Sequence, residues 1–265
     1  MADGNGATAG ERNEEVRGWP AVKVVLFENK YSTAQWLLRM YTIGCTLFFL
    51  VPLFGSQFSA NCFKRVLLSS ATISALRLHQ RLPRFQFSRL FFQQLIQEDA
   101  FHYLCYSVLF IMAHAATLVL IPITLFAVLH AGSFTRRIID AAGSDNFFLR
   151  RIRPYVLKVE DRQTQQSLLQ FIASSEIMMM LVTILMLLSA QASFLVPFFY
   201  YRFLQLRYTS RRNPYSRLMF QQMRLGVEQL ARNPKCPAVV GRVLFGFTGF
   251  VSRLAPAAQE QQQQQ

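Results

Sequence analysis

Charged and uncharged positions are separated into long blocks along this chain. Three blocks contain no Asp, Glu, Lys or Arg: Met40–Phe63 with 24 residues, Ala100–Thr135 with 36 and Ile177–Tyr201 with 25. A helix needs about 20 apolar residues to cross a hydrocarbon core of about 30 Å. Each block is therefore long enough to enter a bilayer, and the sequence predicts an integral membrane protein. Because unpaired backbone groups are not tolerated in lipid, we expect an all-α fold.

Turn-forming residues inside the blocks predict that each block is broken into shorter helices. Pro52 and Gly55 interrupt the first block, and the small polar run Ser189–Ser193 interrupts the third. The second block is long enough for two helices, with a break near Ala113–Thr117 or at Pro122. Helices this short fit a bilayer by tilting, by thinning the membrane or by a shallow position.

Basic residues flank the blocks in numbers that bear on topology. Residues 64–89 hold six Lys or Arg, residues 136–162 hold seven, and ten more follow from Arg202 onward. Basic flanks usually stay on the cytosolic side of a membrane. Helical hairpins that enter and leave by the cytosolic face keep all three basic regions there, and the sequence favours this arrangement. The alternative is a conventional bundle of three or four spans that partly violates the bias.

The expected organisation is a polytopic helical membrane protein with a polar leader and an amphipathic tail. We predict a disordered polar leader over 1–27, a helical membrane domain over 28–208, a cytosolic tail of amphipathic helices over 209–256 and a low-complexity glutamine tail over 257–265. The units of the membrane domain are expected at about 28–82, 90–138 and 165–208.

Two segments of the tail have the three- and four-residue spacing of amphipathic helices. They are Pro214–Arg232 and Pro237–Leu254. The apolar face of the first consists of Tyr215, Leu218, Met219, Met223, Val227 and Leu230, and that of the second includes Val240, Val243, Leu244, Phe247, Val251 and Leu254. Such faces bind a lipid surface or pack on the protein's own membrane helices, and the sequence leaves both possibilities open.

The arginines in and before these segments are expected to contact anionic lipid headgroups or a partner protein. They are Arg202, Arg207, Arg211, Arg212, Arg217, Arg224, Arg242 and Arg253. The formal net charge of +14 is also typical of nucleic-acid-binding proteins. Because the basic residues lie beside apolar blocks, they indicate membrane topology and lipid contact, and we expect no nucleic-acid partner.

The best candidate for a catalytic group is Glu98, His102 and Cys105, spaced four and three residues apart on one helical face. The same spacing suits the polar edge of a helix that enters a membrane. The scattered cysteines form no CxxC pair and no nucleotide-binding or hydrolase motif is present, so we expect no enzyme activity, cofactor or metal. Arg39 and Glu176, near block ends, are expected to extend to the membrane interface.

Three strings carry a family resemblance: Ser74–Pro83 (SALRLHQRLP), the run from Tyr200–Leu204 (YYRFL) to Arg211–Tyr215 (RRNPY), and Ser252–Pro256 (SRLAP). With the sequence over about residues 25–256, they resemble the transmembrane protein 33 / Krueppel homolog 2 family, which includes fungal nuclear pore membrane proteins. The resemblance implies a multi-pass protein of the endoplasmic reticulum membrane and nuclear envelope without catalytic residues.

The same resemblance implies partners among reticulon-type membrane-shaping proteins, nuclear pore membrane proteins and stress sensors of the reticulum. Together with the basic flanks and the amphipathic tail, it predicts a non-enzymatic protein that modulates tubule and pore membrane shape by lipid insertion and partner binding. The alternative function is an intramembrane regulatory subunit of a reticulum stress sensor or channel.

Overall fold

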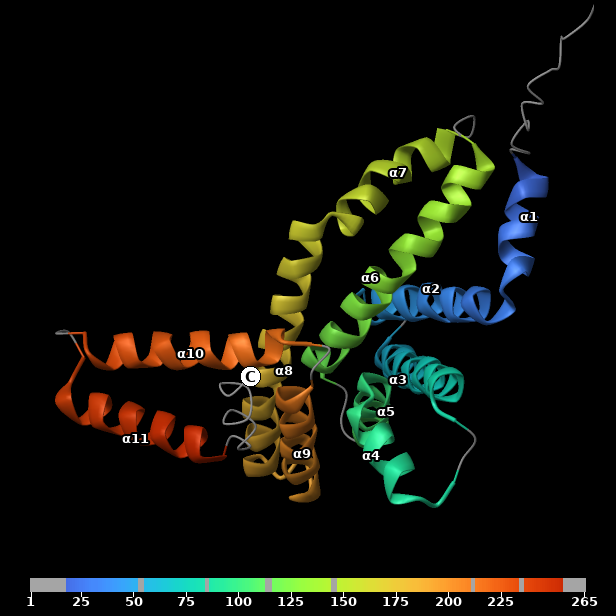
Figure 1. Ribbon diagram of the computed structural model, residues 1–265. Helices are drawn as coiled ribbons and strands as arrows, with labels where there is room; N and C mark the ends of the chain where they lie inside the picture. The colour runs from blue at the N-terminus through green and yellow to red at the C-terminus, as the bar shows by residue number, and fades with distance from the viewer. Residues whose placement is uncertain are drawn as a thin grey trace, which may run out of the picture.

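The computed structural model describes residues 18–51, 55–83, 86–112, 116–143, 147–210, 213–233 and 236–254. In these residues the fold is all-α, as predicted, with eleven helices and no strand (Figure 1). The helices are α1 (Trp19–Glu28), α2 (Lys30–Leu50), α3 (Ser56–Arg81), α4 (Arg89–Gln97), α5 (Asp99–Ile111), α6 (Thr117–Ala142), α7 (Phe147–Glu160), α8 (Arg162–Leu188), α9 (Leu195–Thr209), α10 (Tyr215–Ala231) and α11 (Ala238–Leu254).

The uncharged blocks are interrupted where the sequence places turn-forming residues. α2 and α3 are separated at Gly55, whose φ of +87° is a conformation that glycine adopts without strain. Pro52 lies outside the described residues. In the second block, α5 ends and α6 begins around the first of the two predicted breaks, whereas Pro122 lies inside α6. α8 and α9 are separated at Ser189–Ser193.

α2 and α3 pack side by side in antiparallel orientation. The Gln35 side-chain amide donates to Gln80 Oε1 at 2.9 Å near one end of the pair. At the other end, the Ser59 hydroxyl donates to the Phe49 carbonyl at 3.3 Å. The start of α2 therefore lies beside the end of α3, and the connection between them lies at the opposite end of the pair.

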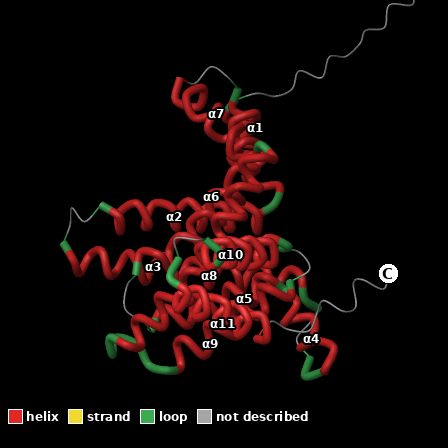
Figure 2. The backbone as a smooth tube through the Cα atoms, turned by 90° about the vertical axis from the view of Figure 1, so that its left-hand side faces the viewer, coloured by secondary structure: helices red, strands yellow, loops and turns green. Residues whose placement is uncertain are grey.

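Two further pairs run antiparallel. In the first, the Tyr106 hydroxyl of α5 donates to the Val119 carbonyl of α6 at 2.9 Å. The Tyr103 ring, earlier in α5, packs on Phe126, later in α6, so the two helices run in opposite directions and touch through side chains. In the second, the Tyr200 hydroxyl of α9 donates to the Glu176 carbonyl of α8 at 2.7 Å. α5 also packs against α3 and α9, and α6 against α2 and α8, so the three pairs form one helical body (Figures 1 and 2).

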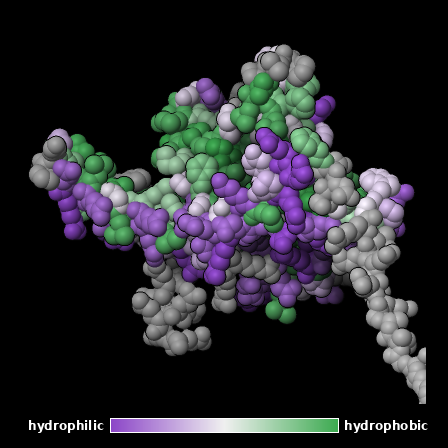
Figure 3. Space-filling model, turned by 90° about the horizontal axis from the view of Figure 1, so that it is seen from above, coloured by the Kyte–Doolittle hydropathy of each residue, from purple (hydrophilic) through white to green (hydrophobic). Residues whose placement is uncertain are grey.

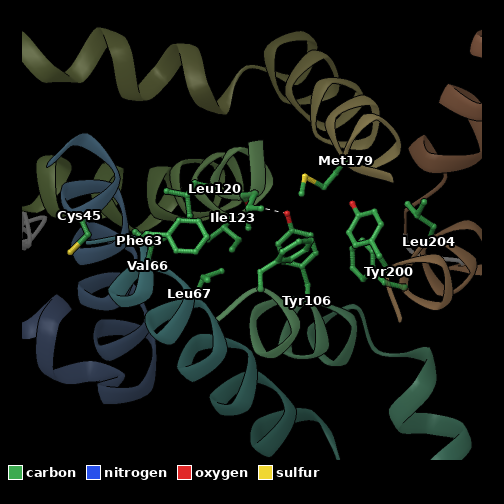
Figure 4. Packing of buried hydrophobic residues seen from close by; sticks show 13 residues of the cluster. Cys45, Phe63, Val66, Leu67, Tyr106, Leu120, Ile123, Met179, Tyr200 and Leu204 are labelled. Carbon is green, nitrogen blue, oxygen red and sulfur yellow. Dashed lines mark hydrogen bonds between the residues drawn. The ribbon is translucent and has the colours of Figure 1, made fainter. Parts of the chain in front are cut away.

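One apolar cluster joins the three pairs. Tyr106 and Phe110 of α5 lie at its centre, with their ring centroids 4.8 Å apart, and Tyr200 and Phe203 of α9 pack against them. Figure 4 shows the cluster: Cys45, Phe63, Val66, Leu67, Tyr106, Phe110, Val119, Leu120, Ile123, Met179, Tyr200, Phe203 and Leu204. Burial of these side chains is the main apolar contribution to holding the pairs together.

α1, the end of α6 and α7 extend away from this body (Figure 1). Ion pairs tie them together: Arg137 contacts Glu28 at 2.7 Å and Arg136 contacts Glu160 at 3.0 Å. α1 corrects the prediction of a disordered leader over residues 1–27, because residues from Trp19 onward are helical and pack on α6. Its apolar composition explains the difference, since Val22 is buried there. Residues 1–17 and the glutamine tail lie outside the described residues.

Two of the described helices, α6 and α8, are long and apolar enough to cross a membrane. α5 is apolar but shorter, and α2 and α3, which share the first block, fall below this level. Seen from above, hydrophobic side chains gather on one part of the surface and hydrophilic side chains form a separate band (Figure 3). α10 and α11 lie side by side beyond α8 and α9, at the segments predicted to form amphipathic helices (Figure 1).

Candidate functional site: a buried ion pair beside an arginine-lined cavity

A buried ion pair joins α8 and α9. Arg207 Nε lies 3.1 Å from Glu176 Oε2, and each side chain is only 1% exposed. Arg207 Nη1 lies 3.3 Å from Asp99 Oδ1, which brings the start of α5 into the cluster. The Tyr103 hydroxyl donates to the Glu176 carboxylate, and the Tyr200 hydroxyl donates to the Glu176 backbone carbonyl. One carboxylate thus holds three helices in register.

The surroundings keep Arg207 charged. Burial lowers the pKa of Arg207, but the Glu176 carboxylate, Tyr103 and Asp99 more than offset this effect, so the net pKa is raised. The guanidinium also lies over the Tyr103 ring, 5.2 Å from its centroid. Because a buried charge without a partner is costly, removal of either member of the pair leaves the other in an unfavourable place.

A cavity of about 250 Å³ adjoins this ion pair. Side chains from α2, α3, α5, α6, α8 and α9 line it, together with Asn213 and Tyr215. Four arginines contribute to the wall, and we call the space the arginine cavity. They are Arg39, Arg77, Arg81 and Arg207. Asp99 is the one carboxylate among the described lining residues.

Arg39 and Arg77 lie in a crowded positive environment. Arg39 is 8% exposed and donates to two neutral oxygens, the His130 carbonyl at 3.2 Å and Gln35 Oε1 at 3.1 Å. Burial and then the charge of Arg77 lower the pKa of Arg39 to about 10. Burial and then Arg81 lower the pKa of Arg77, with Asp99 acting in the opposite direction. The cavity therefore favours a negative charge.

Three charged residues lie where the sequence interpretation did not place them. Arg207 was expected to contact lipid headgroups or a partner protein, but it is buried, and Glu176 and Asp99 neutralise it inside the protein. Glu176 and Arg39 were expected to extend to the interface, and both are buried among neighbouring helices instead. A snorkelling side chain needs a path to water, and the packing of α5, α8 and α9 closes that path for Glu176.

The other predicted contact arginines differ in exposure. Arg202 and Arg224 are exposed and bond along their own helices, to Gln205 at 3.0 Å and Glu228 at 2.7 Å. Arg217 is half-buried and donates to the Ser210 carbonyl at 3.1 Å. The remaining four are Arg242 and Arg253, which are exposed, and Arg211 and Arg212, which lie outside the described residues. Contact of these residues with lipid or a partner stays a prediction.

The predicted apolar faces of α10 and α11 are divided between protein contact and solvent. Half-buried positions, where the helices pack on each other and α10 packs on α8, are Tyr215, Met219, Met223, Val227, Leu244 and Val251. Exposed positions are Leu218, Leu230, Val240 and Val243. Phe247 and Leu254 belong to α11, but their side chains lie outside the described residues. Residues are therefore available both for packing on the protein's own helices and for binding a lipid surface.

Glu98, His102 and Cys105 have three different surroundings. Glu98 pairs with Arg81 at 3.1 Å. His102 is 1% exposed, and its Nε2 lies 2.7 Å from the Ile96 carbonyl, whereas Cys105 is exposed. These contacts favour separate structural roles over one catalytic group.

Sequence reasoning missed Asp99, Tyr103, Arg77 and Arg81 as members of one site. A signal existed for part of it, because charged residues directly precede all three blocks: Arg39, Asp99 and Glu176. If the block ends meet, these charges meet as well. Arg77 and Arg81 carry no comparable signal, because at least thirteen residues separate them from the end of the first block.

The described residues form an all-helical fold with two helices that are long and apolar enough to cross a membrane, which agrees with the class of helical membrane proteins. The family model described as "Transmembrane protein 33/Nucleoporin POM33" matches residues 14–257, and the chain belongs to this family. The chain is 45% identical over 233 residues to Transmembrane protein 33 of Homo sapiens, covering 87% of this chain and 92% of that protein.

Other relatives agree with this assignment. Transmembrane protein 33 of Mus musculus is 46% identical over 231 residues, covering 87% of this chain and 92% of the relative. Krueppel homolog 2 of Drosophila melanogaster is 39% identical over 231 residues, covering 87% of this chain and 81% of the relative. No solved structure matches the chain.

Proposed function

We propose that this protein modulates the shape of the endoplasmic reticulum network and the nuclear pore membrane without catalysing a reaction. It inserts its three antiparallel helix pairs into the bilayer as hairpins and binds membrane partners such as reticulon-type proteins. The name of the matching family model includes a nucleoporin, which supports a place at the nuclear pore membrane.

The observation that carries this proposal is the meeting of the block ends at one cavity. Arg39 precedes the first block, Asp99 precedes the second and Arg207 follows the third, and all three line the arginine cavity. His130, near the end of the second block, also lines it. A chain that returns to its starting level after each block is typical of hairpin insertion from one side.

The opposite ends of the pairs expose large apolar side chains. They include Leu47, Leu50, Met112, Leu188, Phe194 and Leu195, which are 53–88% exposed. Burial of these side chains in hydrocarbon is favourable by about 25 cal/mol for each Å² removed from water. Each helix pair thus has one apolar end, which we call its tip, and one charged end at the arginine cavity. This arrangement supports shallow insertion that occupies more area in the cytosolic leaflet than in the lumenal leaflet. Such a wedge favours curved membrane.

The test measures the topology of the chain, that is, the side of the membrane on which each region lies. In a variant whose four cysteines are replaced, single reporter cysteines at the exposed positions Gln86, Gln163 and Gln222 mark the charged side of the molecule. Gln57 and Ser193, also exposed, mark two of the tips. Sealed reticulum microsomes are treated with a membrane-impermeant maleimide before and after permeabilisation.

Hairpin insertion predicts that the three charged-side reporters react in sealed vesicles and that the tip reporters do not. If one charged-side reporter reacts only after permeabilisation, the chain crosses the membrane conventionally and the wedge is excluded. The alternative function, a regulatory subunit for a membrane sensor or channel, would then be favoured. A reporter that reacts fully in detergent-solubilised protein provides the control for intrinsic reactivity.

A further inference from the structure

The arginine cavity contains more positive charge than its neighbours neutralise. Arg207 pairs with Glu176 and Asp99, and Arg81 pairs with Glu98. In the described part of the chain, no carboxylate lies within ion-pair distance of Arg39 or Arg77. Two guanidinium groups therefore line the cavity without an ion-pair partner of their own, although Asp99 lies in the same wall, and one of the two is more than nine-tenths buried.

A second observation also indicates a site for an anion. Nη2 of Arg207 is buried and has no hydrogen-bond partner among the described residues, although Arg207 lines the cavity. A buried guanidinium nitrogen without an acceptor is unfavourable, because it has lost its hydrogen bonds to water and gained none in return. Ser74 lies in the same wall, and its hydroxyl can add a polar contact for a bound anion.

We propose that the arginine cavity binds a phosphate monoester, supplied by the headgroup of an anionic phospholipid or by a soluble phosphate ester. Arginine presents its N–H donors in a planar fork that matches phosphate oxygens in pairs. The volume of about 250 Å³ lies just below the range of about 300–1,000 Å³ that holds drug-sized ligands, so it suits a headgroup whose acyl chains lie outside the cavity.

The place of the cavity favours the lipid as the source. It lies where the charged ends of the helix pairs meet, and α6, one of the two helices able to cross a membrane, contributes Ile123 and His130 to its wall. Lipid phosphates occupy the boundary between hydrocarbon and water, where such helix ends lie. The inference rests on membrane insertion but not on membrane shaping, so its failure and that of the proposed function are distinguishable.

The test uses the purified full-length protein in a neutral detergent. Phosphatidic acid in mixed micelles is the lipid probe, and glycerol 3-phosphate is the same headgroup without acyl chains. Phosphatidylcholine and phosphatidylglycerol control for micelle composition and for general negative charge. Binding is measured by the shift of the thermal unfolding midpoint and by native mass spectrometry.

Arg77→Gln is the main variant, because this half-buried side chain makes no hydrogen bond in the described part of the chain. It is expected to weaken phosphatidic acid binding by about tenfold or more, the loss of one charge-assisted contact. Arg137→Gln removes the same charge from an exposed position outside the cavity and is expected to bind as the wild type does. Arg39→Gln, at the buried arginine, is expected to act as Arg77→Gln does.

The binding results distinguish a lipid headgroup from a soluble phosphate ester as the source of the phosphate. A shift with phosphatidic acid but not with glycerol 3-phosphate identifies a lipid headgroup as the ligand, and equal shifts identify a soluble phosphate ester. The proposal is overturned if neither compound binds, or if phosphatidylglycerol binds equally well. The proposal is also overturned if Arg77→Gln and Arg137→Gln bind phosphatidic acid with the same affinity. The thermal unfolding midpoint without ligand checks that Arg77→Gln is folded. It is expected to lie close to that of the wild type, because Arg77 makes no hydrogen bond or ion pair in the described part of the chain.

Discussion

Arg207 and Glu176 form an ion pair in the interior, with 3.1 Å between Nε and Oε2 and 1% exposure of each side chain. The two residues are 31 positions apart and lie on neighbouring helices of one antiparallel pair. The pair fixes the position of α9 on α8, while Asp99 extends the same charge network to α5. This network connects α5, α8 and α9, each of which contributes residues to the wall of the arginine cavity.

Replacement of one member of the pair is expected to destabilise the protein strongly. Glu176→Gln removes the fully buried partner of Arg207 and leaves only the partly exposed Asp99 to offset its charge, so the free energy of unfolding should fall by about 3–5 kcal/mol. Thermal and denaturant unfolding in detergent measure the change. The matched control is Arg224→Gln, which breaks the exposed pair between Arg224 and Glu228 and should cost about 0.3–0.5 kcal/mol.

A double-mutant cycle tests whether the effect belongs to the pair. The combined variant Glu176→Gln/Arg207→Gln should lose less stability than the sum of the single variants, by about 0.5–3 kcal/mol. Strict additivity would contradict a direct interaction between the two side chains.

The Tyr200 hydroxyl is expected to make a smaller contribution to the same contact. Tyr200 is fully buried, and its hydroxyl donates to the Glu176 carbonyl at 2.7 Å. Tyr200→Phe keeps the ring packing and removes this bond, so the free energy of unfolding should fall by about 0.5–1.5 kcal/mol. Tyr155→Phe, at a side chain that is 66% exposed, should change it by less than about 0.5 kcal/mol. Equal effects of the two substitutions would show that the Tyr200 bond adds nothing.

Much of the helical layout could be predicted from the sequence, because the determinants are local. Gly55 and the run Ser189–Ser193 mark interruptions of helices, and the spacing of apolar residues marks α10 and α11. The membrane arrangement of the helix pairs remains a prediction. α1 was missed because its ten residues have too weak a periodicity to stand out beside a polar leader.

The site itself could not be predicted, because its charges meet only through packing. Arg207 resembles the basic residues around it in sequence, and nothing local distinguishes it from Arg202, which is exposed. Its partner Glu176 precedes another block, and their contact depends on the turn between α8 and α9. Arg77 similarly becomes a cavity residue only because α3 packs beside α5.

Close packing of the two tail helices predicts opposite effects at two glycines of α11. A Cβ atom at Gly241 would lie 3.0 Å from the Ala231 carbonyl oxygen of α10, whereas a Cβ at Gly246 would have no neighbour within 4 Å. Gly241→Ala should therefore disturb the α10–α11 contact and cost about 1–3 kcal/mol. Gly246→Ala should stabilise α11 by about 0.5–1 kcal/mol, through helix propensity alone.

Hydrogen exchange of the α11 amides is the measurement, because the effect is confined to the tail. Faster exchange in Gly241→Ala and slower exchange in Gly246→Ala are expected relative to the wild type. If both substitutions slow exchange, the helices do not pack closely in solution and the lipid-bound form of α11 becomes the relevant state.

The exposed side of α11 provides the last prediction, which concerns lipid binding by the tail. Val239 and Val243 are 66% and 65% exposed and lie one helical turn apart. If this side inserts into a curved membrane, the α11 amides of the full-length protein should be protected from exchange in small proteoliposomes more than in large ones. Val239→Asp/Val243→Asp should abolish this difference, because carboxylates are costly to bury in lipid.

Ser252→Asp is the control for this prediction. It adds charge on the opposite side of the helix, 180° from Val243 at about 100° per residue, and should leave the difference intact. Equal protection in small and large vesicles for the wild type would remove curvature sensing from the tail and leave the helix pairs as the source of any membrane shaping.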